Sequence, residues 1–367
     1  MRITNLKVFG FMNRTPPLEI KFQNDLNIIT GRNGSGKTSL LKLIWYISSG
    51  NILMALREID FKEATLETTE YECKITRQSS QTCKILLSHN GKTEEFSDKY
   101  DQEGNVTDNA EDFVDTILQE IGSSIFFPTF RRIEGGFGLT TSNTRLSRAR
   151  IELEESLSSL THQLSSKKHK LISALSTSDI VNLIAQQYSD LSDEYEKRQK
   201  KNSQSIIKLI KDFKKQEKEE QNSTAIDLIE KINESIEKMD QEREEIMKPL
   251  SSAKNYALKL VRPSGIKIAK RFCFGDIASA IQSEVLSSGE KQMFSFISYN
   301  AFYKDSQIFI DEPELSLHAD WQRQLFTTLA NQESSNQFIV STHSPFIYSK
   351  YPDKEIQIES SRGDEEL

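Results

Sequence analysis

The chain has 367 residues, of which 36% are hydrophobic and 28% charged, and its formal net charge is −7. This length suffices for one large domain or two ordinary ones, and the acidic balance argues against a surface that coats nucleic acid broadly, though local basic patches remain compatible with it. No apolar run is long enough to cross a bilayer and the start lacks the apolar core of a secretory signal, so we expect a cytoplasmic protein that makes no membrane contact.

The first part of the chain, up to about residue 145, is rich in predicted strands. Short stretches alternate between apolar and polar residues, and Asn90-Gly91 is typical of a tight turn within a meander. Pro128 is expected to stop the last of these strands. The predicted strand regions are residues 2–11, 18–30, 71–96 and 123–130.

The chain has three cysteines, Cys73, Cys83 and Cys273, and none of them forms a CxxC pair. We expect reduced, inert thiols. The alternative is that Cys73 and Cys83 face each other across a hairpin.

A second region, from about residue 145 to 247, contains neither proline nor glycine. Its apolar residues recur in heptad steps of three and four, which predicts narrow apolar seams between helices. We expect at least three helices forming a short antiparallel coiled-coil arm that ends at Pro249; the alternative is a helical subdomain packed on the body. The seam residues are Leu153, Leu157, Leu160, Leu164, Ala225, Ile229, Ile232, Ile236 and Met239.

The last region returns to a mixed pattern with two buried apolar strands, one within SQIFIDEPE and one within NQFIVSTHSP, separated by predicted helices. Such apolar runs indicate a parallel sheet covered on both faces. We therefore predict an α/β fold with a predominantly parallel sheet, an antiparallel β region and a helical coiled-coil insertion. Its segments are an N-terminal body part (1–145), the insertion (146–250) and a C-terminal body part (251–367).

The segment between the second predicted strand and the next helix reads GRNGSGKTS, which fits the pattern G-x-x-x-x-G-K-[ST]. Glycines allow the backbone to wrap phosphates, and the start of the helix adds a favourable dipole. A lysine at this place neutralises the β- and γ-phosphates, and the following hydroxyl holds Mg²⁺; the alternative is a tight turn without a ligand. The candidate nucleotide-binding residues are Arg32, Asn33, Gly34, Ser35, Gly36, Lys37, Thr38 and Ser39.

Polar residues follow both apolar strands of the last region. Asp311 can reach the Mg²⁺ shell with Thr38, and Glu312 can orient or deprotonate a water that faces the γ-phosphate. His343 can bond the γ-phosphate and that water. The alternatives are a turn before a helix for the acidic pair and a structural role for the histidine.

A further segment, LSSGEKQ, opens a predicted helix at residue 286. Small residues at a helix N-terminus form an anion site. Because the chain already has one phosphate loop, we expect this second anion site to serve the nucleotide of a second copy of the protein.

The order of these segments, ending in FIDEPE and STH, resembles the ABC-type ATPases of the SMC, DNA-repair and OLD-like branch, the AAA_15 and AAA_21 families. The resemblance implies an ATPase head that binds ATP and Mg²⁺ and turns over slowly. Two heads would sandwich two ATP molecules, with Ser287 and Gly289 reaching the γ-phosphate in trans. Glu312 would be the catalytic base and His343 the switch histidine.

The sequence departs from this family pattern in several places. Ser288 stands where glycine is common, and Glu290 where glutamine is common. The glutamine that contacts Mg²⁺ in the family is missing from FFPTFRRIEGG, which has Arg131 and Arg132 instead; these arginines could sense phosphate, pair with an acid or touch a partner. The insertion has no CxxC, which rules out a zinc hook.

The segments DEPELSLHADWQ and FPTFRRIEGG are similar to those of ATPase subunits in bacterial anti-phage systems such as PARIS, Septu and some retron systems. This resemblance implies a homodimer, or a higher oligomer, that senses a trigger and controls a separate effector such as a nuclease or toxin. Because the chain ends about two dozen residues after His343, we expect the effector to be another protein.

Two other functions compete with this one. The first is an ATPase that clamps DNA in repair or chromosome maintenance, for which a basic cluster near the base of the arm would be suited. The second is a transporter ATPase, which the inserted arm and DEPELSLH disfavour. The basic cluster consists of Arg131, Arg132, Arg145, Arg148 and Arg150, and its alternative is a set of solvated helix charges.

Overall fold

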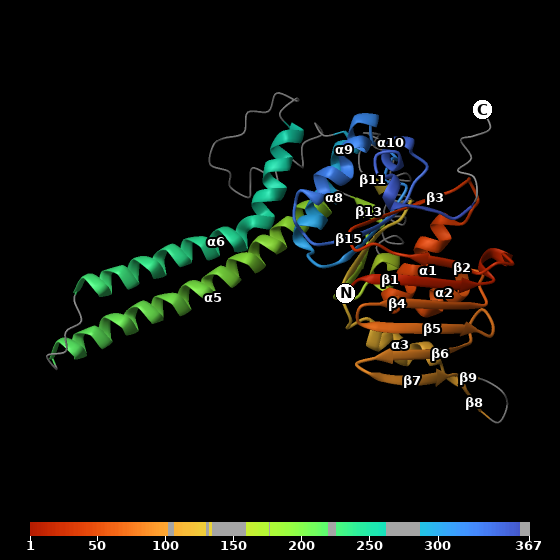
Figure 1. The fold of residues 1–367 in the computed structure, drawn as a ribbon, viewed down its shortest axis with the longest axis horizontal. Helices are drawn as coiled ribbons and strands as arrows, with labels where there is room; N and C mark the ends of the chain where they lie inside the picture. Colours follow the sequence, from red (N-terminus) through yellow and green to blue (C-terminus); the bar gives the residue numbers. More distant parts are fainter. Residues whose placement is uncertain are drawn as a thin grey trace, which may run out of the picture. The chain divides into compact units, whose positions relative to one another are not determined.

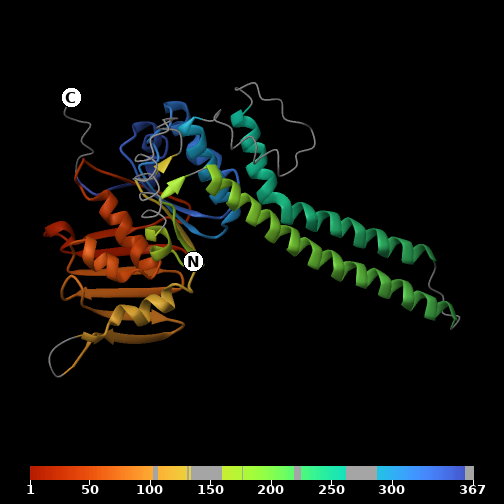
Figure 2. The same ribbon diagram turned by 180° about the vertical axis from the view of Figure 1, so that it is seen from behind.

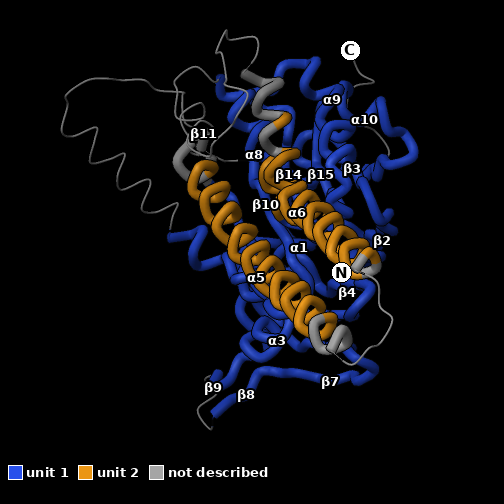
Figure 3. Tube along the Cα trace, turned by 90° about the vertical axis from the view of Figure 1, so that its left-hand side faces the viewer, with its two compact units in different colours: residues 1–176, 287–296, 303–367 blue, residues 177–286, 297–302 orange. Residues whose placement is uncertain are grey.

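The computed structural model of the protein forms two units, which Figure 3 shows in different colours. The first comprises residues 1–176, 287–296 and 303–367, and the second residues 177–286 and 297–302. The residues that the structure describes are 1–101, 106–129, 132–133, 159–175, 177–218, 225–261 and 287–359.

The first unit contains an antiparallel sheet in the strand order β2–β1–β4–β5–β6–β7 (Figure 1). The strands are β1 (Ile3–Phe9), β2 (Leu18–Lys21), β4 (Glu63–Thr68), β5 (Tyr71–Arg77), β6 (Cys83–His89) and β7 (Lys92–Ser97). Asn90 and Gly91 join β6 to β7 with φ angles of 52° and 73°. Two successive positive φ values match the right-handed twist of a hairpin, so the predicted meander and its turn are confirmed.

The hairpin β5–β6 keeps the two described cysteines apart. Cys73 lies opposite Leu87, and Cys83 lies opposite Arg77. Both are buried free thiols, and burial raises the pKa of each. The alternative that they face each other is therefore wrong; Cys273 lies outside the described residues.

The second sheet of this unit is parallel, with the order β12–β10–β14–β15–β3–β16. Its strands are β3 (Leu26–Thr30), β10 (Ser124–Phe127), β12 (His169–Leu171), β14 (Gln307–Asp311), β15 (Gln337–Ser341) and β16 (Glu355–Gln357). Every residue of β3, β10, β14 and β15 is buried. The strands predicted within SQIFIDEPE and NQFIVSTHSP are thus confirmed as central strands of a parallel sheet, β14 and β15.

Helix α1 (Lys37–Ser48) shares one hydrophobic core with both sheets (Figures 1 and 2). Trp45 stacks on Phe126 of β10 with ring centroids 5.2 Å apart, and its indole N–H donates to the Ser124 hydroxyl at 3.1 Å. Two shorter helices, α2 (Ile52–Glu58) and α3 (Ala110–Leu118), complete this side, and α3 packs on β6 and β7. The helix that carries the phosphate loop is therefore fixed from several directions.

The opposite face of the parallel sheet is covered by α9 (Ala319–Ala330) and by the part of α8 (Ser288–Phe302) that belongs to this unit, up to residue 296. Phe296 meets Phe127 of β10 edge-on at 5.0 Å, and Phe326 meets Phe338 of β15 at 5.9 Å. Helices thus cover both faces of the sheet, as predicted. The remaining short elements of this unit are η1 (Phe11–Asn13), β8 (Lys99–Tyr100), β9 (Val106–Asp108), β11 (Arg132–Ile133), β13 (Ala174–Leu175), α10 (Pro345–Tyr348) and η3 (Pro352–Lys354).

The second unit is built on two long helices, α5 (Thr177–Lys218) and α6 (Ala225–Val261), which pack side by side (Figure 1). Polar contacts join them: Asn202 donates to Glu242 at 3.2 Å, and the Arg243 guanidinium lies over the Tyr195 ring at 5.8 Å. The predicted helical insertion is confirmed. Pro249 lies inside α6 rather than at its end, so the predicted stop at this proline is wrong.

The apolar seam of α6 differs from the predicted one. Ile229 and Ile236 are 57% and 48% exposed, whereas Ile246 is buried and Leu228, Ile232 and Met239 are partly buried. The inward stripe begins at Leu228 and includes Ser235 and Glu242, which the apolar pattern passed over. Because two adjacent stripes of the helix both show steps of three and four, spacing alone could not choose between them.

Residues 159–175, which the sequence analysis assigned to the insertion, belong to the first unit and supply β12 to its parallel sheet. Leu164 is buried in the core of that unit, and Leu160 is 47% exposed. The other two predicted seam leucines, Leu153 and Leu157, lie outside the described residues. The division at 145 and 250 stays a proposal.

Candidate functional site

The glycine-rich loop connects β3 to α1, and Gly36 caps the helix. Gly34 and Gly36 have φ angles of 81° and 87°, a region that side chains rarely adopt. A Cβ on Gly36 would lie 2.3 Å from the Met12 sulfur. The close packing of the loop on Phe11 and Met12 therefore requires glycine and leaves a helix N-terminus of the kind that receives phosphate.

Lys37 is only 5% exposed and points into this loop. Its ammonium group donates to the carbonyl oxygens of Gly31 at 2.9 Å and Arg32 at 3.0 Å. Burial lowers the pKa of Lys37, while nearby carboxylates, above all that of Glu312, raise it. The Ser35 hydroxyl is also buried, and the described residues give it no hydrogen-bond partner. A buried cation beside an unsatisfied hydroxyl fits a phosphate oxygen.

Asp311, at the end of β14, is fully buried and gathers hydroxyl groups from three other segments. Its Oδ1 accepts a hydrogen bond from Thr38 at 3.2 Å and another from Ser341, and its Oδ2 accepts one from Thr129. The structure thus brings the two predicted magnesium ligands together. Thr129 and Ser341 had not been predicted.

The donor set around Asp311 has a clear chemical preference. A carboxylate and a hydroxyl are hard oxygen ligands, and Mg²⁺ is commonly held by one or two protein groups together with substrate phosphates and water. Within the described ranges, no cluster of three or more histidine, cysteine, aspartate or glutamate side chains could hold a metal by itself. The residues present fit Mg²⁺ that arrives with a nucleotide.

Glu312 follows Asp311 directly and has a φ angle of 48°. This left-handed conformation is strained for a residue with a side chain. Its backbone N–H donates to the Ser341 carbonyl at 2.9 Å, which holds it at the end of β15. Among the carboxylates that raise the pKa of Lys37, that of Glu312 acts most strongly.

His343 is exposed just beyond β15, and its backbone N–H donates to Glu314 Oε1 at 2.7 Å. The Thr342 hydroxyl donates to the other oxygen of Glu314 at 2.8 Å. Partial burial and the charge of Lys37 lower the pKa of His343. Glu314 was missed by sequence reasoning; its place two residues after Glu312 was the available signal.

Ser287 and Gly289 lie at the start of α8 and make contacts within their own subunit. The backbone N–H and the hydroxyl of Ser287 each donate to Glu290 Oε2 at 2.7 Å, and the Glu290 N–H donates back to the Ser287 hydroxyl at 3.3 Å. This is a capping box. A Cβ on Gly289 would lie 2.4 Å from the Ser316 carbonyl oxygen. Their predicted role in trans stays a prediction.

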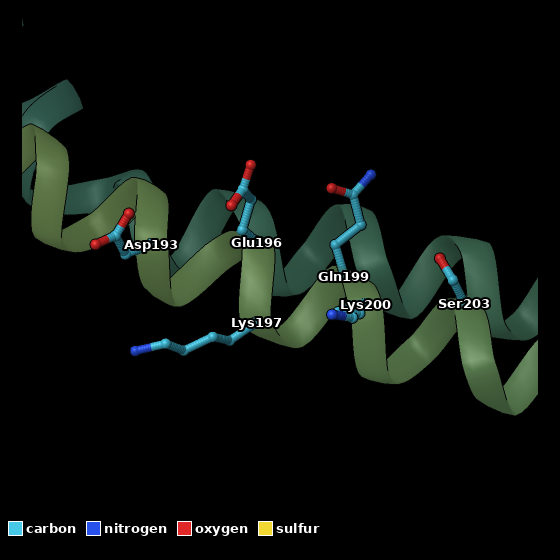
Figure 4. Close-up of a pocket in the computed structure, with 6 residues that line it drawn as sticks. All are labelled: Asp193, Glu196, Lys197, Gln199, Lys200 and Ser203. Atoms are coloured by element: carbon cyan, nitrogen blue, oxygen red, sulfur yellow. The ribbon is translucent and has the colours of Figure 1, made fainter.

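The other predicted residues are spread more widely. Arg32 and Asn33 are exposed on the loop, and Ser39 is partly exposed in the first turn of α1. Arg132 lies in β11, whereas Arg131, Arg145, Arg148 and Arg150 lie outside the described residues. A surface hollow on α5 contains none of the predicted site residues (Figure 4); its lining is Asp193, Glu196, Lys197, Gln199, Lys200 and Ser203.

A parallel sheet whose glycine-rich loop joins a central strand to a buried helix is the arrangement of P-loop nucleotide-binding proteins. The sequence model of the AAA ATPase domain matches residues 1–348, and the chain belongs to this family of ATPases. None of the described helices is long and apolar enough to span a membrane.

Two curated relatives are DNA replication and repair proteins named RecF. The one from Francisella tularensis subsp. novicida is 46% identical over 48 residues, 13% of this chain and 14% of the relative. The one from Histophilus somni is 29% identical over 100 residues, 25% of this chain and 28% of the relative. The chain thus spans about a quarter or less of these relatives' length.

Two solved structures are similar to this chain. The Smc head domain with a coiled coil and joint from Pyrococcus yayanosii has a TM-score of 0.40 and 14% identity, covering 99% of this chain and 96% of that one. The Smc head domain with an extended coiled coil from Pyrococcus furiosus, bound to the C-terminal domain of ScpA, has a TM-score of 0.37 and 14% identity, covering 95% and 91%.

Proposed function

We propose that the protein is an ABC-type ATPase that binds ATP with Mg²⁺ in the loop between β3 and α1 and hydrolyses it slowly. The observation that carries this proposal is the hydrogen bond from Thr38, next to Lys37 at the start of α1, to Asp311 at the end of β14. When bound, ATP would supply the anhydride bond that is cleaved, and Mg²⁺, held by Thr38 and Asp311, would neutralise negative charge on the phosphates.

The chain's own residues have separate roles in binding the phosphates, holding the metal and activating the attacking water. Lys37 holds positive charge against the phosphates, and its low exposure strengthens this interaction because the local dielectric is low. Thr38 and Asp311 offer oxygen atoms to the metal shell. Glu312 accepts the proton of the attacking water. His343, just beyond the end of β15, donates a hydrogen bond to the γ-phosphate.

The complete site forms between two copies of the chain. Ser287 and Gly289 of the second copy contact the γ-phosphate. This contact gives a function to the second anion-binding helix start of the chain, that of α8, beside the first at α1. Closed pairs can associate further into rings or larger assemblies.

The cellular role we propose is that of a sensor or scaffold in bacterial anti-phage defence, holding a separate effector protein such as a nuclease or toxin until triggered. The support for this role is a resemblance in sequence. The segments DEPELSLHADWQ, which contains Asp311, Glu312 and Glu314, and FPTFRRIEGG are similar to those of ATPase subunits in such systems. Opening of the heads after hydrolysis would release the stored effector.

A second candidate is an ATPase that clamps DNA in repair or chromosome maintenance. The similarity to the two RecF proteins favours it, because their name assigns them to DNA replication and repair. DNA-stimulated ATP turnover is the property that would distinguish this role from the first.

The first experiment measures the native mass of Glu312→Gln, purified with its neighbouring gene products, with and without ATP. A mass that rises to an even multiple of 42.0 kDa only with ATP supports the shared site. An ATP-independent assembly that carries a second polypeptide supports the effector scaffold. A chain that stays monomeric and alone in both conditions contradicts the proposed assembly, and Glu312→Gln with normal turnover rejects Glu312 as the base. Lys37→Ala, which should fail to bind ATP, is the matched control.

A further inference from the structure

Thr129 lies two residues beyond the end of β10 at Phe127, within the segment FFPTFRRIEGG, which contains no glutamine. β10 runs parallel to β14, with Phe127 beside Ile310. The chain continues through Pro128 beyond the end of the strand, and the partly buried Thr129 hydroxyl donates to Asp311 Oδ2. The position thus holds a hydroxyl that reaches the neighbouring strand's acid.

We infer that Thr129 is the positioning residue of the magnesium site, acting through Asp311; this inference rests on the proposed function. The two carboxylate oxygens of Asp311 accept hydrogen bonds from different segments of the chain. Oδ1 receives the hydroxyls of Thr38 and Ser341, and Oδ2 receives that of Thr129. A hydrogen bond to the far oxygen stops the carboxylate from rotating, so Oδ1 stays directed at Thr38.

The local chain is suited to this role. Proline fixes its own φ angle, which limits the directions that the residue after the strand can take. Threonine is branched at Cβ and has few side-chain rotamers, so little entropy is lost when its hydroxyl is aimed at Asp311. A glutamine would reach the metal shell with its own amide, whereas Thr129 fixes an existing ligand instead.

A purely structural hydrogen bond makes a different prediction from a positioning role. Removing a structural bond lowers stability but leaves the response to Mg²⁺ unchanged. Removing a positioning bond leaves nucleotide binding without metal unchanged and raises the Mg²⁺ concentration needed to tighten it. The Mg²⁺ dependence of ATP binding therefore separates the two roles without relying on turnover.

The test measures ATP affinity by calorimetry in the full-length protein, first in EDTA and then across a Mg²⁺ titration. For Thr129→Val we expect unchanged affinity in EDTA and a Mg²⁺ midpoint about tenfold higher. Thr129→Ser, which keeps the hydroxyl, should restore the wild-type midpoint. Thr116→Val is the control, because the exposed Thr116 hydroxyl donates to the Asp112 carbonyl within α3.

The possible outcomes distinguish a failure of the role of Thr129 from a failure of the proposed ATPase function. A wild-type midpoint in Thr129→Val would overturn the role of Thr129 and leave the proposed function standing. A wild-type chain that binds ATP in neither condition would overturn the proposed function and the inference with it. If the valine variant does not fold, Thr129→Ala carries the same comparison, judged against Thr129→Ser.

Discussion

Glu290 accepts hydrogen bonds from both the backbone N–H and the hydroxyl of Ser287, at 2.7 Å each. Ser287 is also one of the two residues that we propose for the γ-phosphate of a second subunit. In the free chain a carboxylate therefore occupies the anion position at the start of α8, where the helix dipole favours negative charge. The incoming phosphate would have to displace a negative group of the protein itself.

Replacing Glu290 by glutamine should favour ATP-dependent pairing. The amide oxygen can still accept the Ser287 bonds, but the charge that repels the γ-phosphate is gone. In the Glu312→Gln background we expect pairing at about tenfold lower protein concentration, equal to about 1.4 kcal/mol, measured by mass photometry with saturating ATP. Glu120→Gln, at a side chain 72% exposed, is the control. Unchanged pairing would mean that the capping box and the phosphate do not compete.

Gly289→Ala should destabilise the protein although alanine favours helices. The gain in helix propensity is at most about 1 kcal/mol, whereas the new Cβ would lie 2.4 Å from the Ser316 carbonyl oxygen. Because this neighbour is backbone and cannot rotate away, we expect a net loss of about 1–3 kcal/mol in urea unfolding. Ser288→Ala is the neighbouring control. Equal or higher stability of Gly289→Ala would show that α8 can move away from Ser316.

The local part of the site was predictable because its signals are contiguous in sequence. Glycine spacing, Lys37 and the apolar strand before Asp311 each depend on a few neighbouring residues. The hydroxyls around Asp311 were not predictable in the same way: Thr38 and Asp311 are 273 positions apart, and Thr129 and Asp311 are 182 apart. Only the strand order of the parallel sheet brings them together.

The packing of the two long helices, α5 and α6, shows a second limit of prediction from the sequence. Ile229 and Ile236 have the spacing of a seam, yet both are exposed, because the stripe that faces α5 contains the polar residues Ser235 and Glu242. Spacing identifies a helix and its period. Which stripe is buried depends on the partner helix, and the sequence of one helix does not contain that information.

Asp115 should make the protein less stable as the pH rises. Burial, reinforced by Glu111 and Asp112, raises the pKa of Asp115 to about 7, while the bond from the Ile52 N–H lowers it. Between pH 4 and pH 7 the folded state keeps a proton that the unfolded state has released. Stability contributed by this group is therefore full below pH 4 and declines, by at most about 1.4 kcal/mol per pH unit, until pH 7.

Asp115→Asn tests this dependence because the amide oxygen still accepts from Ile52. The variant should lose less stability than the wild type when urea unfolding is compared at pH 5 and pH 8. Asp190→Asn, at an exposed position of α5, is the control. Parallel pH profiles for wild type and Asp115→Asn would show that Asp115 is already ionised at pH 5 in the folded protein.

Lys37 and Lys42 lie on the same helix and allow a matched test of nucleotide binding. Lys37 is buried in the loop, whereas Lys42 is a partly exposed side chain that pairs with Glu58 at 2.8 Å. A ligand at a hundred times its Kd stabilises the folded state by about 2.7 kcal/mol. With ATP added we expect a clear rise in melting temperature for the wild type and for Lys42→Ala. Lys37→Ala should show little rise, because the phosphates lose their buried cation and affinity falls at least about tenfold. An equal rise in both variants would contradict the assignment of the loop between β3 and α1 as the ATP site.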